Sequence, residues 1–290
     1  MAEQEAVIRF ENMSYRYPRR KNWVLKDINL EIHKREFVAI MGANGAGKTT
    51  LCECINGIIP NSAQGKMKGR VVVNGKDTQE TEVAELATQV GIVLEDPETQ
   101  LFTTVIRNEV AFGPENLKVD PDEIRRRVEW ALKVVGLEEY ADRQPTALSG
   151  GQKQRLAIAT ALAMGTEIMV LDEPTAQLDP LGTRDVFEVI RELKESLGMT
   201  IIIATHKSEE IAEFADKVCV LKEGTVQAYD TPRVIFSDTE LLMENWIRPP
   251  QVSELASYLA KRGVPFESFP ILRAEACQLA KNWCGVSENE

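Results

Sequence analysis

Residues 42–49 have the sequence GANGAGKT, which fits the phosphate-binding pattern G-x-x-x-x-G-K-[ST]. Glycines allow backbone N–H groups to curl around phosphate oxygens. The apolar run at residues 36–41 predicts a buried strand before the loop, and the residues after it predict a helix whose positive end also attracts phosphate. We therefore expect a nucleotide site in which Lys48 reaches the β- and γ-phosphates and the Thr49 hydroxyl binds Mg²⁺. The loop residues expected to contact the nucleotide are Gly42, Asn44, Gly45, Gly47, Lys48, Thr49 and Thr50.

A second, acidic motif belongs with this loop. Residues 168–172 form an apolar run that ends in the carboxylate of Asp172, and Glu173 follows directly. In P-loop folds an aspartate in this position holds Mg²⁺, often through water. A carboxylate just beyond it can orient or deprotonate the attacking water. Alone, the two acids would be an ordinary strand end, but together with the phosphate loop they predict nucleotide hydrolysis.

The composition indicates a folded protein of the cytosol. The chain has 290 residues, of which 43% are hydrophobic, enough for one large α/β domain with an appendage or for two modest domains. The formal net charge of −11 argues against a nucleic-acid partner. The sequence has no run of about 18 apolar residues, and its first residues lack the features of a signal peptide. Reduced thiols are expected for Cys52, Cys54, Cys219, Cys277 and Cys284.

These motifs stand on alternating strands and helices. Apolar or alternating runs predict strands at residues 6–11, 24–32, 36–41, 70–73, 168–171, 200–204 and 217–221. Helices are expected at residues 121–136, with Asp120 as cap and Gly136 at the end, and at residues 184–196. The later alternation implies a parallel sheet covered on both faces, next to an antiparallel layer from the first strands. Two further helices, ending near residues 263 and 283, predict a small C-terminal appendage.

Residues 148–155, LSGGQKQR, form a second glycine-rich turn that leads into a helix, and thus a second anion cradle. One nucleotide does not need two such loops from one chain. The segment resembles the signature motif of ABC ATPases, a family in which this loop clasps the γ-phosphate of ATP bound to a partner subunit. The resemblance implies that Ser149, Gly151 and Gln152 serve the ATP of a second chain, and that two cassettes pair head to tail around two shared sites.

Other motifs of this family follow in order over about residues 6–240. LDEPT at residues 171–175 resembles the extended Walker B motif, and Asp179 resembles the D-loop aspartate. His206 resembles the switch histidine, and Tyr17 matches the aromatic residue that stacks on adenine. The resemblance implies a catalytic set formed by Glu173, His206 and Lys48. It also implies a magnesium site formed by Thr49 and Asp172.

The same resemblance implies an α/β fold of the P-loop NTPase class. It is the ABC cassette, with an antiparallel β subdomain and a helical signature subdomain at about residues 100–165. We assign residues 1–244 to the ABC ATPase domain and residues 245–290 to a small, α-rich C-terminal appendage. The expected role of the appendage is contact between two chains away from the ATP sites.

A narrower resemblance involves EDPETQLF at residues 95–102 and EVAFGPENL at residues 109–117. These segments are similar to the ATPases of energy-coupling factor (ECF) transporters, which take up cobalt, nickel or vitamins. The similarity implies a peripheral motor on the cytoplasmic face of the cell membrane, bound to a transmembrane coupling (T) subunit and a substrate-binding (S) subunit. In that group residues near 95–105 form a groove for coupling helices whose arginines meet acidic residues, for which the candidates are Asp96, Glu98 and Glu109.

The alternative is a soluble ABC ATPase outside transport, acting in assembly or on nucleic acid. Chromosome-maintenance members insert a long heptad coiled coil into the cassette, and translation-factor members carry two cassettes in one chain; this sequence shows neither feature. The acidic groove and the appendage disfavour an assembly scaffold of the iron–sulfur type. The sequence leaves open the transported solute and the choice between a homodimer and a heterodimer.

Glu95 departs from the family, which normally has glutamine at this position, with an amide oxygen on Mg²⁺ or its water. Glutamate keeps an oxygen for the metal and the nucleotide but adds a negative charge beside a polyphosphate. We predict that the wild-type site still hydrolyses ATP, because Lys48, Asp172, Glu173 and His206 are all present. Steady-state turnover of Glu95→Gln measures the effect of the charge. A rise of more than about tenfold, roughly 1.4 kcal/mol in the barrier, would show that Glu95 restrains the enzyme.

Overall fold

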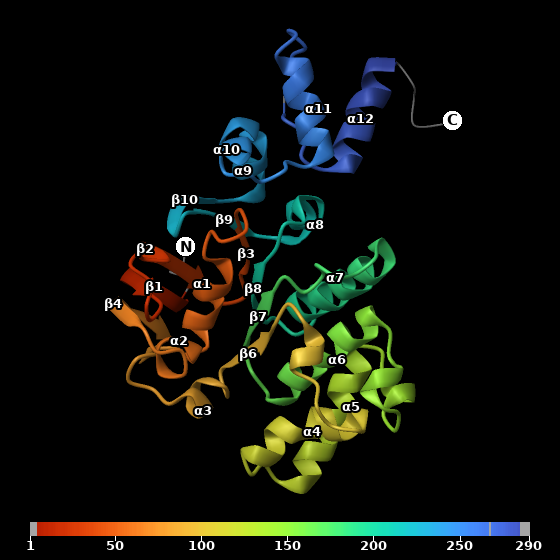
Figure 1. The fold of residues 1–290 in the computed structure, drawn as a ribbon. Coiled ribbons are helices and arrows are strands. Elements are labelled where there is room, and N and C mark those ends of the chain that lie inside the picture. The colour runs from red at the N-terminus through yellow and green to blue at the C-terminus, as the bar shows by residue number, and fades with distance from the viewer. Residues whose placement is uncertain (1–4, 267, 285–290) are drawn as a thin grey trace.

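The computed structural model describes residues 5–266 and 268–284 as alternating strands and helices (Figure 1). The strands are β1 (Ala6–Arg16), β2 (Leu25–His33), β3 (Phe37–Met41), β4 (Lys66–Val73), β5 (Lys76–Asp77), β6 (Val90–Val93), β7 (Ile168–Asp172), β8 (Thr200–Ala204), β9 (Lys217–Lys222) and β10 (Thr225–Asp230). The helices are α1 (Lys48–Ile55), α2 (Ile58–Asn61), α3 (Val83–Leu86), α4 (Ile106–Asn116), α5 (Pro121–Val134), α6 (Gly150–Ala163), α7 (Pro180–Glu195), α8 (Ser208–Phe214), α9 (Pro232–Ser237), α10 (Thr239–Glu244), α11 (Gln251–Ala260) and α12 (Arg273–Cys284). Short 3-10 helices are η1 (Pro97–Thr99), η2 (Glu138–Tyr140) and η3 (Pro145–Ala147).

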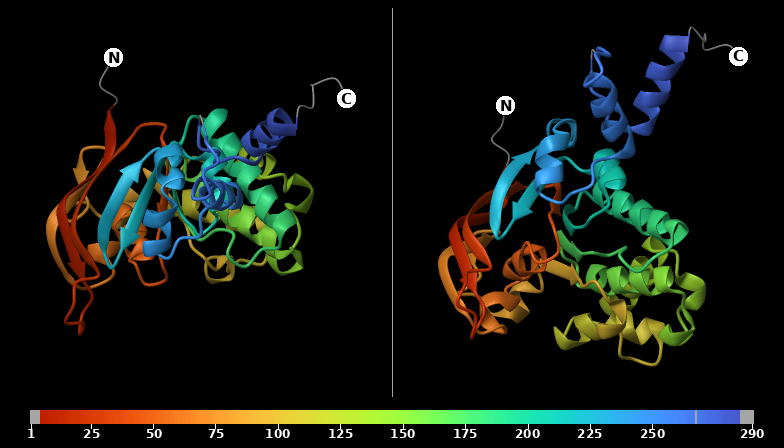
Figure 2. Two further views of the ribbon diagram at one scale, coloured as in Figure 1. Left: turned by 90° about the horizontal axis from the view of Figure 1, so that it is seen from above. Right: turned by 45° about the horizontal axis from the view of Figure 1, so that its top comes forward.

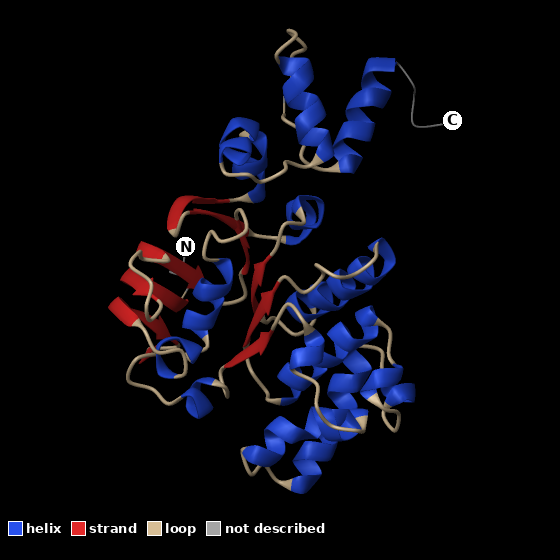
Figure 3. Cartoon of the chain, viewed as in Figure 1, coloured by secondary structure: helices blue, strands red, loops and turns tan. Residues whose placement is uncertain are grey.

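The strands form two sheets, drawn in red in Figure 3. The smaller sheet is antiparallel, with the order β2-β1-β4-β5. The larger sheet has the order β10-β9-β3-β8-β7-β6, in which β10 runs antiparallel to β9 and the other pairs are parallel. Because β3, β8 and β7 are parallel neighbours, the segments that follow them leave the sheet at the same edge. This topology brings together three motifs that are far apart in the sequence.

The parallel sheet is buried on both faces, and its side chains alternate between two hydrophobic cores. In β3, Val38 and Ile40 pack in the core shared with α1 and the antiparallel sheet. Phe37, Ala39 and Met41 pack in the core shared with helices α4 to α7. All five side chains are completely buried. This period of two, with both faces apolar, is the pattern expected of a strand that is covered on both sides.

Helix α1 lies between the two sheets and begins at the end of the phosphate loop (Figure 1). The loop needs glycine at both of its ends. Gly47 has a φ of 109°, and a Cβ atom there would lie 2.9 Å from the Leu25 side chain. A Cβ atom on Gly42 would lie 2.1 Å from the backbone oxygen of Leu221 in β9. Only glycine lets the loop pass this close to its neighbours and then turn into the helix.

Helices α4, α5 and α6 pack together on the opposite side of the parallel sheet from the antiparallel sheet, as the views of Figure 2 also show. Helix α5 begins as its sequence predicts, because the Asp120 carboxylate accepts hydrogen bonds from the backbone N–H groups of Asp122 (2.9 Å) and Glu123 (3.3 Å). Gly136 follows the end of the helix with a φ of 65°. This helical region carries the signature segment at the start of α6.

The C-terminal helices lie at one end of the molecule (Figure 1). Helices α9 and α10 pack against each other, and α11 contacts both. The predicted boundary between residues 244 and 245 falls between α10 and α11, and residues 285–290 of the predicted appendage lie outside the described residues. Across the part of the chain that the structure describes, no helix has the length and apolar character needed to cross a bilayer.

The predicted antiparallel layer, parallel sheet and helical region are confirmed, but some elements differ from the prediction. Strand β1 runs beyond residue 11 because a bulge near Asn12, whose φ is 48°, lets it bend while it pairs with β2 and β4. Helix α4 was not expected, since Gly113 and Pro114 lie inside it. The thiols of the cysteines whose side chains are described are free, and the side chain of Cys284 lies outside that description.

Candidate active site

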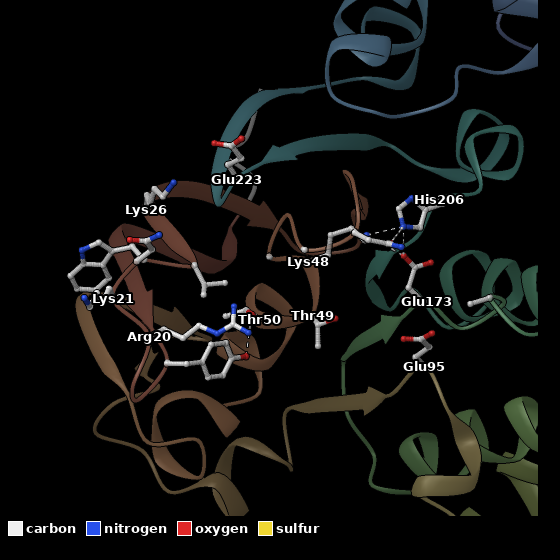
Figure 4. Close-up of a pocket in the computed structure, with 18 residues that line it drawn as sticks. Arg20, Lys21, Lys26, Lys48, Thr49, Thr50, Glu95, Glu173, His206 and Glu223 are labelled. Carbon is white, nitrogen blue, oxygen red and sulfur yellow. Dashed lines mark hydrogen bonds and ion pairs between the residues drawn. The ribbon is translucent and has the colours of Figure 1, made fainter.

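A cavity of about 940 Å³ opens at the edge of the parallel sheet where β3, β7 and β8 end (Figure 4). The phosphate loop and α1 form its floor, while the segments after β7 and β8 form one end. Most of the side chains that the sequence assigned to the nucleotide or to catalysis line this cavity, namely Tyr17, Asn44, Gly45, Gly47, Lys48, Thr49, Thr50, Glu95, Glu173 and His206.

Lys48 is the buried cation of the site, with 7% of its residue surface exposed. Its Nζ atom donates a hydrogen bond to the backbone oxygen of Gly42 at 3.0 Å. The same atom lies 3.3 Å from Oε1 of Glu173 and 2.9 Å from Nε2 of His206. The ammonium group is therefore placed where the phosphate loop, the end of β7 and the end of β8 meet.

Glu173 is held in an unusual backbone conformation directly after β7. Its φ is 47°, in the left-handed region that costs a residue with a side chain of order 1–3 kcal/mol. Its backbone N–H donates to the carbonyl of Ala204 at 2.8 Å, which fixes this turn to β8. Burial raises the pKa of the Glu173 carboxyl group, but the hydrogen bond with His206 and the charge of Lys48 outweigh it and lower the pKa overall. The group is thus kept as a carboxylate that can accept a proton from water.

His206 contacts both the acid and the phosphate loop. Its Nε2 atom lies 3.0 Å from Oε1 of Glu173 and 3.1 Å from Oδ1 of Asn44. Depending on the tautomer, Nε2 donates to these oxygens or accepts from Lys48. The histidine side chain is 42% exposed, so one face of the ring remains open to the cavity.

Asp172 and Thr49 fit a magnesium site behind the phosphate loop. Oδ1 of Asp172 is buried and has no hydrogen-bond partner among the described residues. Burial raises the pKa of Asp172, the hydrogen bond with Thr49 opposes this, and the nearby carboxylates of Glu173 and Glu95 add to the rise. A cation would relieve both the unpaired oxygen and this repulsion. No cluster of three His, Cys, Asp or Glu side chains in the described ranges could hold a metal alone, which fits an ion that takes most ligands from phosphate and water.

The opposite end of the cavity is built from the loop after β1. The Tyr17 hydroxyl bonds to Oε2 of Glu53 and to Oγ1 of Thr50, both at 3.1 Å, and burial raises the pKa of Tyr17 to about 12. Tyr15, by contrast, is a core residue and is completely buried. The sequence did not single out several polar and aromatic side chains at this end, because they belong to no motif: Arg20, Lys21, Asn22, Trp23, Lys26 and Glu223.

The signature segment and Asp179 do not line this cavity. Ser149 is exposed and forms a capping box at the start of α6, in which its hydroxyl accepts from Gln152 N and Oε1 of Gln152 accepts from Ser149 N. A Cβ atom on Gly151 would lie 3.4 Å from Cα of Gly182. Asp179 caps α7 by accepting a hydrogen bond from Gly182 N at 2.7 Å. The two helix starts are therefore packed side by side, outside the nucleotide cavity of their own chain.

The three carboxylates expected to meet a membrane partner are all engaged within the chain. Asp96 accepts from the backbone N–H of Glu98, and Glu98 forms an ion pair with Lys153 in α6. Glu109 contradicts the expectation most clearly: it is 3% exposed, and its Oε2 accepts from the N–H groups of Phe102 (3.1 Å) and Thr103 (2.6 Å). The carboxylate of Glu109 holds the loop before α4, so it is not an exposed contact.

Comparison with known proteins agrees with this geometry. Residues 25–176 match the family described as ABC transporter. The chain is 43% identical, over 266 residues, to the energy-coupling factor transporter ATP-binding protein EcfA1 of Caldanaerobacter subterraneus subsp. tengcongensis. The aligned region covers 90% of this chain and 94% of that protein.

Two solved structures share the fold. One is cbiO1 from Clostridium perfringens, described as part of the ABC transporter complex cbiONQ, with a TM-score of 0.74 and 37% identity over 88% of this chain and 100% of that one. The other is the cassette MJ0796, a dimer in a post-hydrolysis state with ADP and Pi, with a TM-score of 0.67 and 28% identity over 78% of this chain and 99% of that one. The chain therefore belongs to the ABC transporter family, as one of its ATP-binding cassettes that hydrolyse ATP.

Proposed function

We propose that this chain is the motor subunit of an ECF-type importer, peripheral to the cytoplasmic face of the membrane, and that it acts as a dimer of cassettes. The observation that carries the proposal is the exposed start of the signature helix: Ser149 and Gly151 lie outside the chain's own cavity, where they can reach the ATP of a second chain. The likeness to EcfA1 and to cbiO1 supports the type of transporter. Its further partners would be a T and an S subunit, and its cargo a metal ion or a vitamin.

A second chain would complete each site. The positive end of α6 is suited to the γ-phosphate, since Ser149 and Gly150 are exposed at its start and the capping box fixes the first turn of the helix. Asp179, packed against the same helix start, would lie at the same interface. The post-hydrolysis dimer of MJ0796 supports such a pairing. ATP would join two chains at two equivalent sites related by a two-fold axis.

The chemistry follows from the position of three side chains. Lys48 would neutralise charge on the β- and γ-phosphates, and Glu173 would orient water and take its proton. His206 would hold Glu173 toward that water as Lys48 turns to the phosphates, because Nε2 already contacts the carboxylate. Thr49, Asp172 and Glu95 would hold Mg²⁺, which would neutralise charge on the phosphates. Catalysis is therefore positioning and electrostatic stabilisation.

The contact with the membrane subunit is proposed to be apolar at its centre. Phe102 and Phe112 are 63% and 43% exposed and pack edge to face, with ring centroids 4.6 Å apart. They border a cavity of about 230 Å³ between β6, α4 and α6. Exposed aromatic pairs beside a hollow are typical protein contacts. The loop that carries Phe102 starts at Glu95, so movement here would be passed directly to the nucleotide site.

Arg20 is proposed to bind the nucleotide at the end away from the γ-phosphate. Lys48, Glu173 and His206 fix the γ-phosphate end of the cavity, so the ribose and base must extend toward Tyr17 and the loop after it. In Figure 4 the Arg20 side chain reaches into the cavity toward Thr50. A guanidinium group there can bond a phosphate or ribose oxygen.

Replacing Glu173 by glutamine tests the dimeric ATPase. We expect turnover to fall at least about a hundredfold, because the carboxylate that accepts the proton is lost, while ATP binding persists and an ATP-bound dimer accumulates on a sizing column. Wild-type specific activity should rise with protein concentration. Glu195→Gln, at an exposed carboxylate of α7, is the control and should behave as the wild type. Wild-type turnover in Glu173→Gln would contradict the proposed role.

The double variant Phe102→Ala/Phe112→Ala tests the membrane contact. We expect the chain to lose binding to washed membranes of its source cells, measured by co-sedimentation, while basal ATP hydrolysis stays within about twofold because neither ring lines the nucleotide cavity. Trp246→Ala removes an aromatic side chain that is 80% exposed elsewhere and serves as the control. Unchanged membrane binding of the double variant would place the contact elsewhere.

Arg20→Ala tests the second end of the nucleotide site, with Arg19→Ala as the matched control, because Arg19 carries the same charge but does not line the cavity. Loss of one charged hydrogen bond should raise the KM for ATP about tenfold, or about 1.4 kcal/mol, and leave kcat unchanged. Initial rates against ATP concentration give both values. Equal effects of the two variants would point to net charge, and would contradict a direct contact.

A further inference from the structure

Helix α8 links the catalytic histidine to the C-terminal helices. It begins at Ser208, two residues after His206, and the intervening turn is tight: Lys207 N donates to Oγ1 of Thr205 at 3.2 Å, and Ser208 N donates to the carbonyl of His206 at 3.1 Å. The first turn of α8 is therefore joined directly to the backbone of His206. The side chain of His206 in turn contacts Glu173, with Nε2 3.0 Å from Oε1 of the carboxylate.

Two hydrogen bonds tie this first turn to the C-terminal region. Ser208 is 6% exposed, and its hydroxyl donates to the carbonyl of Arg248 at 2.5 Å. The Glu209 carboxylate accepts from the backbone N–H of Gln251 at 2.7 Å, at the first residue of α11. A negative side chain in this position also interacts favourably with the positive end of α11. We call this pair of bonds the C-terminal anchor.

The region beyond the anchor is stiff enough to transmit a displacement. Pro249 and Pro250 are buried between the two anchored residues, and proline fixes φ. The Ser253 hydroxyl of α11 donates to the carbonyl of Pro270, which precedes α12. Arg233 of α9 forms an ion pair with Glu275 of α12. Helices α11 and α12 are thus braced against each other and against the rest of the chain, and we call these two helices the C-terminal unit.

We propose that the C-terminal unit sets the position of His206 through the C-terminal anchor, so that Ser208 and Glu209 are positioning residues for ATP hydrolysis. The inference rests on the proposed role of His206. Anything that displaces the C-terminal unit, such as contact with another chain, would pull on Arg248 and Gln251 and reach His206 through one turn of helix. The path touches the phosphate loop only through the side-chain contacts of His206 with Asn44 and Lys48. The backbone of that loop is held separately by its packing against Leu25 and Leu221, so the effect should fall mainly on the chemical step.

The test compares kcat and KM for ATP in Ser208→Ala, Glu209→Ala and the control Glu210→Ala. Glu210 lies in the same helical turn and carries the same charge, but no hydrogen bond joins it to the C-terminal unit in the described structure. We expect Ser208→Ala and Glu209→Ala to lower kcat about fivefold each without changing KM, since a positioning residue acts on the transition state. Glu210→Ala should match the wild type. Glu209→Gln keeps an oxygen that can accept the Gln251 N–H and should recover most of the activity.

Combination with His206→Ala separates positioning from loss of stability. If the anchor acts through His206, Glu209→Ala should have no further effect on single-turnover hydrolysis in the His206→Ala background. The inference would be overturned if Glu209→Ala lowered single-turnover hydrolysis as much in the His206→Ala background as in the wild type. Equal effects of Glu209→Ala and Glu210→Ala would overturn it as well. Wild-type kcat in His206→Ala would instead overturn the proposed catalytic role of His206. If His206→Ala loses activity while Ser208→Ala and Glu209→Ala are both normal, the proposed function stands and only the inferred role of the C-terminal anchor is contradicted.

Discussion

The parallel pairing of β3, β8 and β7 is the constraint on which the site depends. Asp172 pairs in register with Ala204, and Ile40 pairs with the same residue from the other side. The hydrogen bonds continue past the strands, since Glu173 N donates to Ala204 and Thr205 N donates to Ile40. A shift of one residue in either pairing would turn each side chain to the other face of the sheet and separate the catalytic groups. Both faces of these strands are apolar, so the register is held by the close packing of differently shaped side chains in the two cores.

Electrostatics at this edge is balanced by a few close contacts. The partly buried carboxylate of Glu173 would be costly alone, and Lys48 and His206 compensate it at about 3 Å. Asp172 lacks such a partner and its pKa is raised by burial. The two neighbouring acids therefore differ in character: one is kept charged by side chains, whereas the other is suited to a cation that arrives with the nucleotide. Adjacent positions on one strand end are enough to give two chemical roles.

The sequence predicts the motifs and their strands well, because each rests on a local rule: glycine for a crowded loop, an apolar run for a strand, Asp120 and Gly136 for the ends of α5. The prediction from the sequence failed where the position of a residue depends on tertiary contacts. The sequence predicted Glu109 as an acid that meets a membrane partner, yet the loop at Phe102 folds back and buries it. Arg20 belongs to no pattern and comes to line the cavity only through the path of its loop. The C-terminal anchor likewise joins residues that are 40 and 42 positions apart, which no local rule connects.

In the proposed dimer one chain contributes half of each of two sites, and the fold places these two halves close together. The signature helix α6 and the start of α7 touch through Gly151 and Gly182, while α7 follows the turn that leaves β7 after Glu173. The segment that would hold a partner's ATP is thus packed on the continuation of β7, the strand that precedes the proposed catalytic residue Glu173. A change at one site has a short, contiguous path to the other through this contact. In the proposed dimer, the exposed Ser149 capping box is the part of the chain through which the two sites would be coupled.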